Sequence, residues 1–479
     1  MQASGQSKET GDCRGSARSA APYADGPVPS GANGDRKGKD NGTTGTPEEQ
    51  PAAKKGFLTR VGLLMTTLIP PGGVIASAFN LASTSIGAGI FGLPSATNNS
   101  GLIVGLLYLA LITFLTIYSV HCLVLVGERI GVFTYEGVTR ALLGPAAAHT
   151  LAVIRAFFGF SCCVAYVICV HDIIAATMLN VDAPKFLKQK SGVRLLTFLM
   201  WLFFMLPLVI PKQIDTLRHV SAFAVVFMVY VVGVVIAHSC THGLPENVKS
   251  IRLTNEEDAS VVLFNNGNRA IQGLGVIMFA YVCQVTAYEI YYDMTNRSVY
   301  KFTVATSLGM LMACAMYVLT SVFGYLDFGS KVTGSVLLLY DPIAVPAMMV
   351  AYVGVLVLMF VSFAILLIPS RNALYSIVDW DPEALPFWKR CCSVVFLAGL
   401  ALVCGLFIPG VNTVFGFAGS LSGGLLGFIF PALIMMYGGG FAWDKVGPYH
   451  YITTYGLLIC GVVVVVFGTG ATIWSAAVQ

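Results

Sequence analysis

Residues 79–94 read FNLASTSIGAGIFGLP and lie inside a stretch of 67 residues, 61–127, that has no formally charged side chain. A second uncharged stretch covers 53 residues, 391–443. One transmembrane helix takes about 20 apolar residues, so each stretch is long enough to cross a membrane more than once. Hydrophobic residues make up 56% of the chain and charged residues 11%, whereas charged residues are about 25% of soluble domains. The sequence therefore predicts an all-α polytopic membrane protein.

Apolar runs separated by turn-forming residues predict eleven transmembrane helices. The expected spans lie near 72–96, 102–126, 150–179, 193–210, 217–239, 268–293, 302–326, 342–368, 390–408, 411–436 and 451–474. The segment 134–148 is too polar to cross, and we expect it to form a short amphipathic helix along the inner surface.

The first 56 residues have a different composition, rich in Gly, Ser, Pro and charged residues. Such a segment buries too little apolar surface to offset its chain entropy, so residues 1–56 are expected to be a disordered cytosolic tail. Residues 57–479 are expected to be the transporter domain, with spans 1–5 at about 72–239, spans 6–10 at about 268–436 and span 11 at about 451–474.

Lys and Arg residues indicate the orientation of the spans in the membrane. With the N-terminus in the cytosol, 20 of them lie inside and 8 outside. An odd number of spans then places the C-terminus outside, and we expect the plasma membrane as the location.

The sequence contains no motif typical of a soluble enzyme. HExxH, GxSxG, P-loop and Rossmann glycine patterns are absent from the sequence. The net charge of +4 gives no reason to expect nucleic acid as a partner. We therefore expect no catalytic residue, cofactor or metal, and a small-molecule partner together with the lipid bilayer.

Polar residues at membrane depth are costly and usually face a pathway or a partner. Span 1 places three consecutive hydroxyl residues, 83–85, just before Gly87 and Gly89. One interpretation is a broken helix whose freed backbone groups bind a solute and an ion. The other is a small-residue face that packs against a neighbouring helix.

Span 6 reads YVCQVTAYEIYYDM over residues 281–294, with Gln284, Thr286 and Glu289 after a long uncharged run. An unpaired carboxylate at mid-membrane costs about 2.5–3.5 kcal/mol on insertion scales, so Glu289 requires a cation, a proton or a water-filled cavity. A pathway role and a structural, neutral carboxyl both remain open. Asp172 late in span 3 and Ser362 in span 8 are weaker candidates.

These segments resemble the amino acid/auxin permease family. Residues 79–94 are similar to its first helix, 281–294 to its sixth, and the IPSR at 368–371 to a Phe-Pro-Ile-Arg motif that closes its eighth. The polar tail followed by eleven spans looks most like the amino acid permeases of trypanosomatid parasites. The resemblance implies a LeuT-type fold, in which two inverted repeats of five helices are followed by one extra helix.

The resemblance also implies a substrate site at the unwound part of helix 1 and at a break in helix 6. The sequence has no Gly or Pro at residues 281–285, so this second break rests on the resemblance. The candidate substrate-binding residues are Ser85, Ile86, Gly87, Ala88, Gly89, Tyr281, Cys283, Gln284, Val285, Thr286 and Glu289.

Two positions depart from the sodium-coupled animal members of the family. Those members have a sodium-binding Asn in helix 1 and Thr in helix 8, where this chain has Ser83 and Ser362. They also have proline at the position of Glu289, so this carboxylate is unusual. The candidate ion or proton sites are therefore Ser83, Ser362 and Glu289, and sodium coupling is placed in doubt.

We expect a secondary amino acid permease that imports a cationic substrate, arginine before lysine, by alternating access. Membrane potential, with protons as a candidate coupling ion, is the expected driving force, since one charge moved through 100 mV gains about 2.3 kcal/mol. Two alternatives are retained. One is a proton-coupled carrier of neutral amino acids with Glu289 as the proton site, and the other is an amino acid sensor that signals through its tail.

Overall fold

The computed structural model describes residues 72–182, 184–210, 220–254, 260–377, 380, 385–408 and 410–478. All of them belong to one unit of the chain, Leu58–Gln479. The expected disordered tail, 1–56, lies outside the described residues, as does the start of the expected transporter domain.

Five spans make up the first half of this unit. They are α2 (Val74–Ser85) with η1 (Ala88–Gly92) and α3 (Leu93–Ser100), then α4 (Leu102–Ile130), α6 (Pro145–Asn180), α8 (Lys190–Met200) with the π-helical η2 (Trp201–Met205) and α9 (Leu206–Val209), and α10 (Val220–Thr241).

Six spans follow in the second half. They are α12 (Gly267–Ala280) with α13 (Gln284–Tyr292), then α14 (Val299–Phe328), α15 (Pro346–Ile377), α16 (Phe387–Phe407), α17 (Val411–Ala418) with the π-helical η7 (Gly419–Ile429) and α18 (Phe430–Tyr437), and α19 (Trp443–Val463) with η8 (Val464–Gly468) and α20 (Thr469–Val478).

Short elements connect the spans. They are α5 (Tyr135–Leu143), α7 (Lys185–Lys188), α11 (Leu244–Asn247), η4 (Val248–Ser250), η5 (Gly329–Lys331), η6 (Val336–Leu338) and a parallel pair of two-residue strands, β1 (Ile251–Arg252) and β2 (Val261–Val262).

The eleven expected spans are confirmed over the described ranges. Ten helices are long and apolar enough to cross a membrane, and the pair Val74–Ser85 and Ala88–Ser100, bent by 51°, makes the eleventh. The expected ends differ by a few residues, since span 3 begins at Pro145 rather than near 150. Backbone groups have no water to bind in a bilayer core, so long apolar runs must become helices, and this makes the spans predictable.

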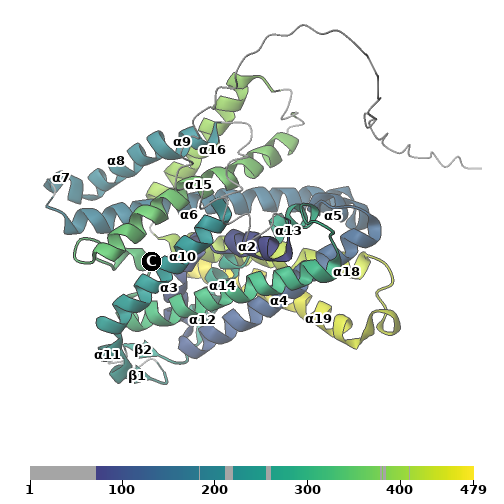
Figure 1. The fold of residues 1–479 in the computed structure, drawn as a ribbon, viewed down its shortest axis with the longest axis horizontal. Helices are drawn as coiled ribbons and strands as arrows, with labels where there is room; N and C mark the ends of the chain where they lie inside the picture. The colour runs from purple at the N-terminus through teal and green to yellow at the C-terminus, as the bar shows by residue number, and fades with distance from the viewer. Residues whose placement is uncertain are drawn as a thin grey trace, which may run out of the picture. The chain divides into compact units, whose positions relative to one another are not determined.

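The broken first span lies in the middle of the packing (Figure 1). Its first half, α2, contacts α10, α13 and α14, and its second half, α3, contacts α12. A second group of contacts joins α6 to α15 and α16. We call the end of the bundle where α3, α6 and α14 terminate the distal end, and the opposite end, where α2 begins, the proximal end.

Most of the expected amphipathic segment at 134–148 forms helix α5 at the proximal end, and its last four residues are instead the first turn of α6. Thr134 caps α5, since its hydroxyl accepts a hydrogen bond from the Gly137 amide at 3.2 Å. Tyr135 is buried and donates a hydrogen bond to the Leu426 carbonyl of η7 at 2.7 Å. Burial raises the pKa of Tyr135 well above its ordinary value, so this hydroxyl stays a donor. The apolar face of α5 is therefore packed against span 10.

Candidate functional site

The first span is broken between α2 and η1. The last helical residue of α2 is Ser85, and Ile86 and Gly87 connect it to η1. In the last turn of α2, the Thr84 hydroxyl donates a hydrogen bond to the Asn80 carbonyl at 2.9 Å. Such back-bonding competes with the regular helix ladder, and glycine weakens the helix further. The hydroxyl-glycine segment therefore forms the break that one interpretation of the sequence expects.

The sixth span is broken between α12 and α13, at Tyr281–Cys283. In place of a helical carbonyl, the Cys283 amide donates to the side-chain oxygen of Gln284 at 3.1 Å. The Cys283 carbonyl in turn accepts from the Thr286 amide and hydroxyl, both at 3.1 Å. Side chains thus satisfy backbone groups that leaving the helix exposes. The break expected from the resemblance is confirmed, and it needs neither glycine nor proline.

Tyr317 of α14 joins the two breaks. Its hydroxyl lies 2.7 Å from the carbonyl oxygen of Ser85, at the end of α2, and 2.7 Å from that of Ala280, at the end of α12. A phenolic hydroxyl has one proton, which these two carbonyls share. Both carbonyls belong to helix ends, which lack intrahelical partners. One buried side chain therefore holds the ends of both half-helices together.

We call the place where the Tyr317 hydroxyl contacts the ends of α2 and α12 the junction. Uncharged side chains surround it. Met310 of α14 places its sulfur 3.9 Å from the Ser85 hydroxyl and 4.0 Å from the Cys283 sulfur. Tyr281 is buried, packs edge-on against Tyr317 with ring centroids 5.0 Å apart, and accepts a hydrogen bond from the Thr113 hydroxyl at 2.8 Å. The junction therefore offers hydroxyl, sulfur and backbone groups rather than fixed charges.

Gln284 and the helix that follows it are tied to span 2. The side-chain nitrogen of Gln284 donates to the Ser119 hydroxyl of α4 at 2.9 Å. One turn further, the Tyr288 hydroxyl donates to the Leu123 carbonyl at 2.6 Å. The expected site residues Val285 and Thr286 lie in the first turn of the same helix. α13 is therefore attached to α4.

The two glycines of the first break have different surroundings. A Cβ placed on Gly89 lies 3.0 Å from both Cα and Cβ of Ala280, so this residue permits close packing of the two broken spans. A Cβ on Gly87 meets the Tyr166 hydroxyl of α6 at 3.2 Å. Gly87 therefore faces span 3, while Gly89 faces span 6. The break and the close packing are both observed, and the binding of a solute and an ion at this segment stays a prediction.

Glu289 is not at the breaks. Its side chain is 67% exposed, and its carboxylate lies 3.0 Å from the Arg155 guanidinium of α6 at the proximal end. The same guanidinium lies 2.9 Å from the carboxylate of Glu136 on α5. Of the three partners that the sequence analysis requires for this carboxylate, a cation, a proton or a water-filled cavity, the structure shows the cation, since Arg155 pairs with Glu289. Its part in substrate recognition stays a prediction.

The remaining candidates lie in different places, and only Asp172 is far from the first break. Ser83 is half-buried on α2, and Ser362 of α15 lies near the Tyr166 hydroxyl. Asp172 is buried on α6, where it lines a cavity at the distal end. The other predicted residues of the first span, Ile86 and Ala88, are buried within the break.

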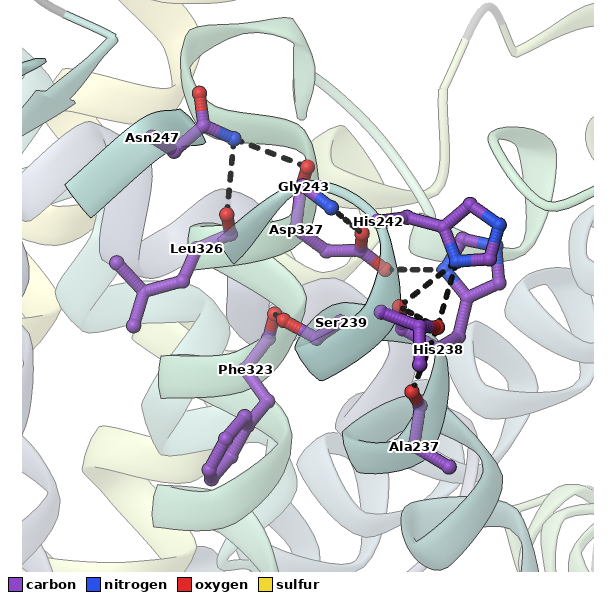
Figure 2. Close-up of polar contacts among 10 residues, drawn as sticks. Ala237, His238, Ser239, His242, Gly243, Asn247, Phe323, Leu326 and Asp327 are labelled. Carbon is purple, nitrogen blue, oxygen red and sulfur yellow. Dashed lines mark hydrogen bonds and ion pairs between the residues drawn. The ribbon is translucent and has the colours of Figure 1, made fainter. Parts of the chain in front are cut away.

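A second polar cluster joins the distal ends of α10 and α14 (Figure 2). His238 Nδ1 lies 2.7 Å from a carboxylate oxygen of Asp327, whose side chain is 1% exposed. The other carboxylate oxygen accepts from the Gly243 amide at 3.3 Å, and Asn247 donates to the Asp327 carbonyl at 3.0 Å. His242 stacks on His238 with ring centroids 4.1 Å apart. The cluster holds span 7 to span 5 and to the loop helix α11.

Several residues of these arrangements were not among the sequence candidates. Tyr317, Met310 and Tyr166 lie within apolar spans, where a tyrosine or methionine resembles an ordinary core residue. His238 and Asp327 are far apart in sequence, so neither indicates the other. The sequence signal that could have found Tyr317 and Tyr166 is their position in the middle of a transmembrane helix, since a tyrosine hydroxyl buried there requires a hydrogen-bond partner.

Comparisons with known proteins agree with this geometry. A family model described as "Transmembrane amino acid transporter protein" matches residues 70–474. The chain belongs to this family. The amino acid/auxin permease resemblance is thereby confirmed, and the protein is an integral membrane amino acid transporter by family rather than an enzyme.

Two curated relatives cover most of the chain. Vacuolar amino acid transporter 5 of Schizosaccharomyces pombe is 25% identical over 376 residues, which are 75% of this chain and 83% of the relative. Sodium-coupled neutral amino acid transporter 7 of Xenopus laevis is 27% identical over 420 residues, which are 82% of this chain and 86% of the relative.

A solved structure shows the same fold. The crystal structure of MhsT in complex with L-phenylalanine superposes with a TM-score of 0.55 at 14% identity, and covers 83% of this chain and 98% of MhsT. This likeness confirms the LeuT-type fold of this amino acid transporter.

Proposed function

We propose that this transporter moves neutral amino acids by alternating access, with the two helix breaks as the substrate site. This proposal rests on the position of the Tyr317 hydroxyl, which lies 2.7 Å from the carbonyl oxygens of the last residues of both α2 and α12. Where two helices are interrupted at one place, free amides suit a carboxylate and free carbonyls suit an ammonium group. An amino acid carries both groups.

In this proposal, the backbone at residues 85–89 and 281–286 takes the α-carboxylate and amine of the substrate. The side chain of the substrate then meets Met310, Cys283 and Tyr281, none of which is charged. An uncharged wall favours a neutral substrate side chain, because a charged one loses hydration without gaining a counterion.

Cationic selectivity, arginine before lysine, is the competing proposal. Its support is the cluster of Glu136, Arg155 and Glu289, in which one guanidinium faces two carboxylates. The cluster carries one excess negative charge at the proximal end. For it to select a substrate, however, Glu289 must leave Arg155 and act away from the breaks.

We propose that membrane potential or protons, rather than sodium, drive transport. Ser83 and Ser362 each supply one hydroxyl where the sodium-coupled members of the family have Asn and Thr. The distribution of Lys and Arg along the sequence, 20 on the expected inner side and 8 on the outer side, supports a cytosolic N-terminus. The choice between plasma membrane and an internal membrane belongs to the same proposal, and one relative is named as vacuolar.

Uptake into proteoliposomes tests the proposed function. The full chain is reconstituted and offered an equimolar mixture of the twenty labelled amino acids, and each transported amino acid is identified by chromatography. Neutral amino acids are expected to dominate, and replacing sodium by choline at fixed membrane potential is expected to leave uptake unchanged. Uptake restricted to arginine and lysine contradicts the neutral assignment, and absence of all uptake contradicts transport.

Glu289→Gln separates the neutral from the cationic proposal. Because the carboxylate is paired with Arg155 outside the breaks, the ranking of competing amino acids is expected to stay the same in the variant. Glu136→Gln serves as the matched control, since it removes the other carboxylate on the same guanidinium. A selective loss of arginine and lysine competition by about ten- to a hundredfold in Glu289→Gln alone supports the cationic proposal instead.

A further inference from the structure

A cavity of about 600 Å³ opens at the distal end, apart from the helix breaks. Its wall comes from the end of α3, the loop after η5, the start of α17, the start of α12 with the segment before it, and from α6 and α20. Most of the lining side chains are uncharged amides and hydroxyls, such as Asn98, Asn265 and Gln272. Of the described residues that line it, two carry a formal charge, Asp172 and Arg269. The cavity is therefore polar, with one side chain of each sign.

Asp172 is an unusual component of this wall. Its relative exposure is 8%, and it has no hydrogen-bond or ion-pair partner within the part of the chain that the structure describes. Cys169 of the same helix and Tyr352 of α15 are ionisable groups that interact with it, and both types are uncharged near neutral pH. A buried carboxylate without a counterion is costly, so this position calls for a cation from the cavity.

Arg269 supplies the complementary charge. It is exposed in the first turn of α12, and no described carboxylate pairs with it. An α-amino acid carries an ammonium and a carboxylate on the same carbon, so it has one charge of each sign, as the wall of this cavity does. Resting on the proposed function, we propose that the distal cavity is a separate binding site for the substrate, in which Asp172 binds its ammonium group and Arg269 attracts its carboxylate.

The position of Asp172 along α6 connects this cavity with the breaks. Tyr166, whose hydroxyl meets a Cβ placed on Gly87, lies six residues earlier on the same unbroken helix. Six residues correspond to about 9 Å along an α-helix. A solute held at Asp172 is thus about two helical turns from the first break. In this proposal, a substrate bound in the cavity moves from there to the helix breaks, which it reaches from the distal side.

Asp172→Asn tests the proposal, because it keeps the shape and removes the charge. Uptake of the best-transported amino acid from the twenty-component assay is measured into right-side-out proteoliposomes. We expect KM to rise by about ten- to a hundredfold with little change in Vmax, since charge-assisted hydrogen bonds are the strong ones. The α-hydroxy acid analogue, which lacks the ammonium group, is expected to inhibit wild type and variant equally.

Two further variants complete the design. Arg269→Gln is expected to raise KM by only about threefold, since an exposed charge contributes little. Lys331→Gln is the matched control, because Lys331 is exposed at the same end without lining the cavity, and its KM is expected to match wild type.

Three outcomes overturn the proposal. The first is an unchanged KM in folded Asp172→Asn. The second is loss of proton-driven accumulation with KM and exchange preserved, which makes Asp172 a proton site. If Asp172→Asn does not fold, Asp172→Glu is used instead, because it keeps the charge. The third outcome is that this variant raises KM for the amino acid and the inhibition constant of its hydroxy analogue alike. Absence of uptake by the wild-type protein instead defeats the proposed function itself.

Discussion

Replacing Tyr317 with Phe is expected to reduce the maximal uptake rate by at least about tenfold. The hydroxyl is the shared partner of the Ser85 and Ala280 carbonyls. Without it the Ser85 carbonyl keeps the Gly87 amide as a donor at 2.9 Å, whereas the buried Ala280 carbonyl loses its hydrogen bond. An unsatisfied buried polar group costs about 1–3 kcal/mol, and each 1.4 kcal/mol is a factor of ten in an equilibrium. The variant therefore shifts the equilibrium away from the arrangement in which both breaks are joined.

Tyr325→Phe is the matched control for this prediction. Tyr325 is on the same helix, two turns closer to the distal end, is equally buried, and accepts a hydrogen bond from the Val262 amide at 2.9 Å. Its loss is expected to lower the thermal unfolding temperature in detergent while uptake is retained. Equal effects of the two variants on uptake would mean that Tyr317 supports the helix rather than the breaks.

The helical architecture was predictable because it depends on local composition. A run of about 20 apolar residues in a bilayer has one way to satisfy its backbone, and the turn residues between runs mark the ends. The break in the first span was also visible, as hydroxyl residues followed by Gly87 and Gly89. These signals lie within one segment and need no knowledge of distant residues.

The break in the sixth span was predictable only from the resemblance, for a physical reason. Its backbone is stabilised by the side chain of Gln284 and by Tyr317, which lies 37 residues beyond Ala280 on another span. A partner that distant leaves no periodic pattern in the sequence. The same limit applies to Glu289, whose partner Arg155 is 134 residues away. The apolar run before Glu289 indicates its depth in the membrane, but nothing in the sequence indicates that it pairs with Arg155.

Replacing a glycine of the first break is the second change that is expected to have a large effect on uptake. A Cβ on Gly89 lies 3.0 Å from the Cα and Cβ of Ala280, and the Ala280 backbone is held by Tyr317. Gly89→Val is therefore expected to abolish uptake and to lower the unfolding temperature, since overpacking costs about 1–3 kcal/mol. Gly399→Val is the control, because a Cβ at Gly399 meets nothing within 4 Å.

Gly87→Val is expected to separate binding from folding. The nearest atom to a Cβ at Gly87 is the Tyr166 hydroxyl at 3.2 Å, the end of a side chain that can move. The fold is therefore expected to survive, with a monodisperse profile and an unfolding temperature close to wild type. Uptake is expected to be lost, because a branched side chain covers the backbone groups that the substrate must reach. Normal uptake by Gly87→Val would contradict the placement of the substrate at the first break, and a collapse like that of Gly89→Val would assign both glycines to packing.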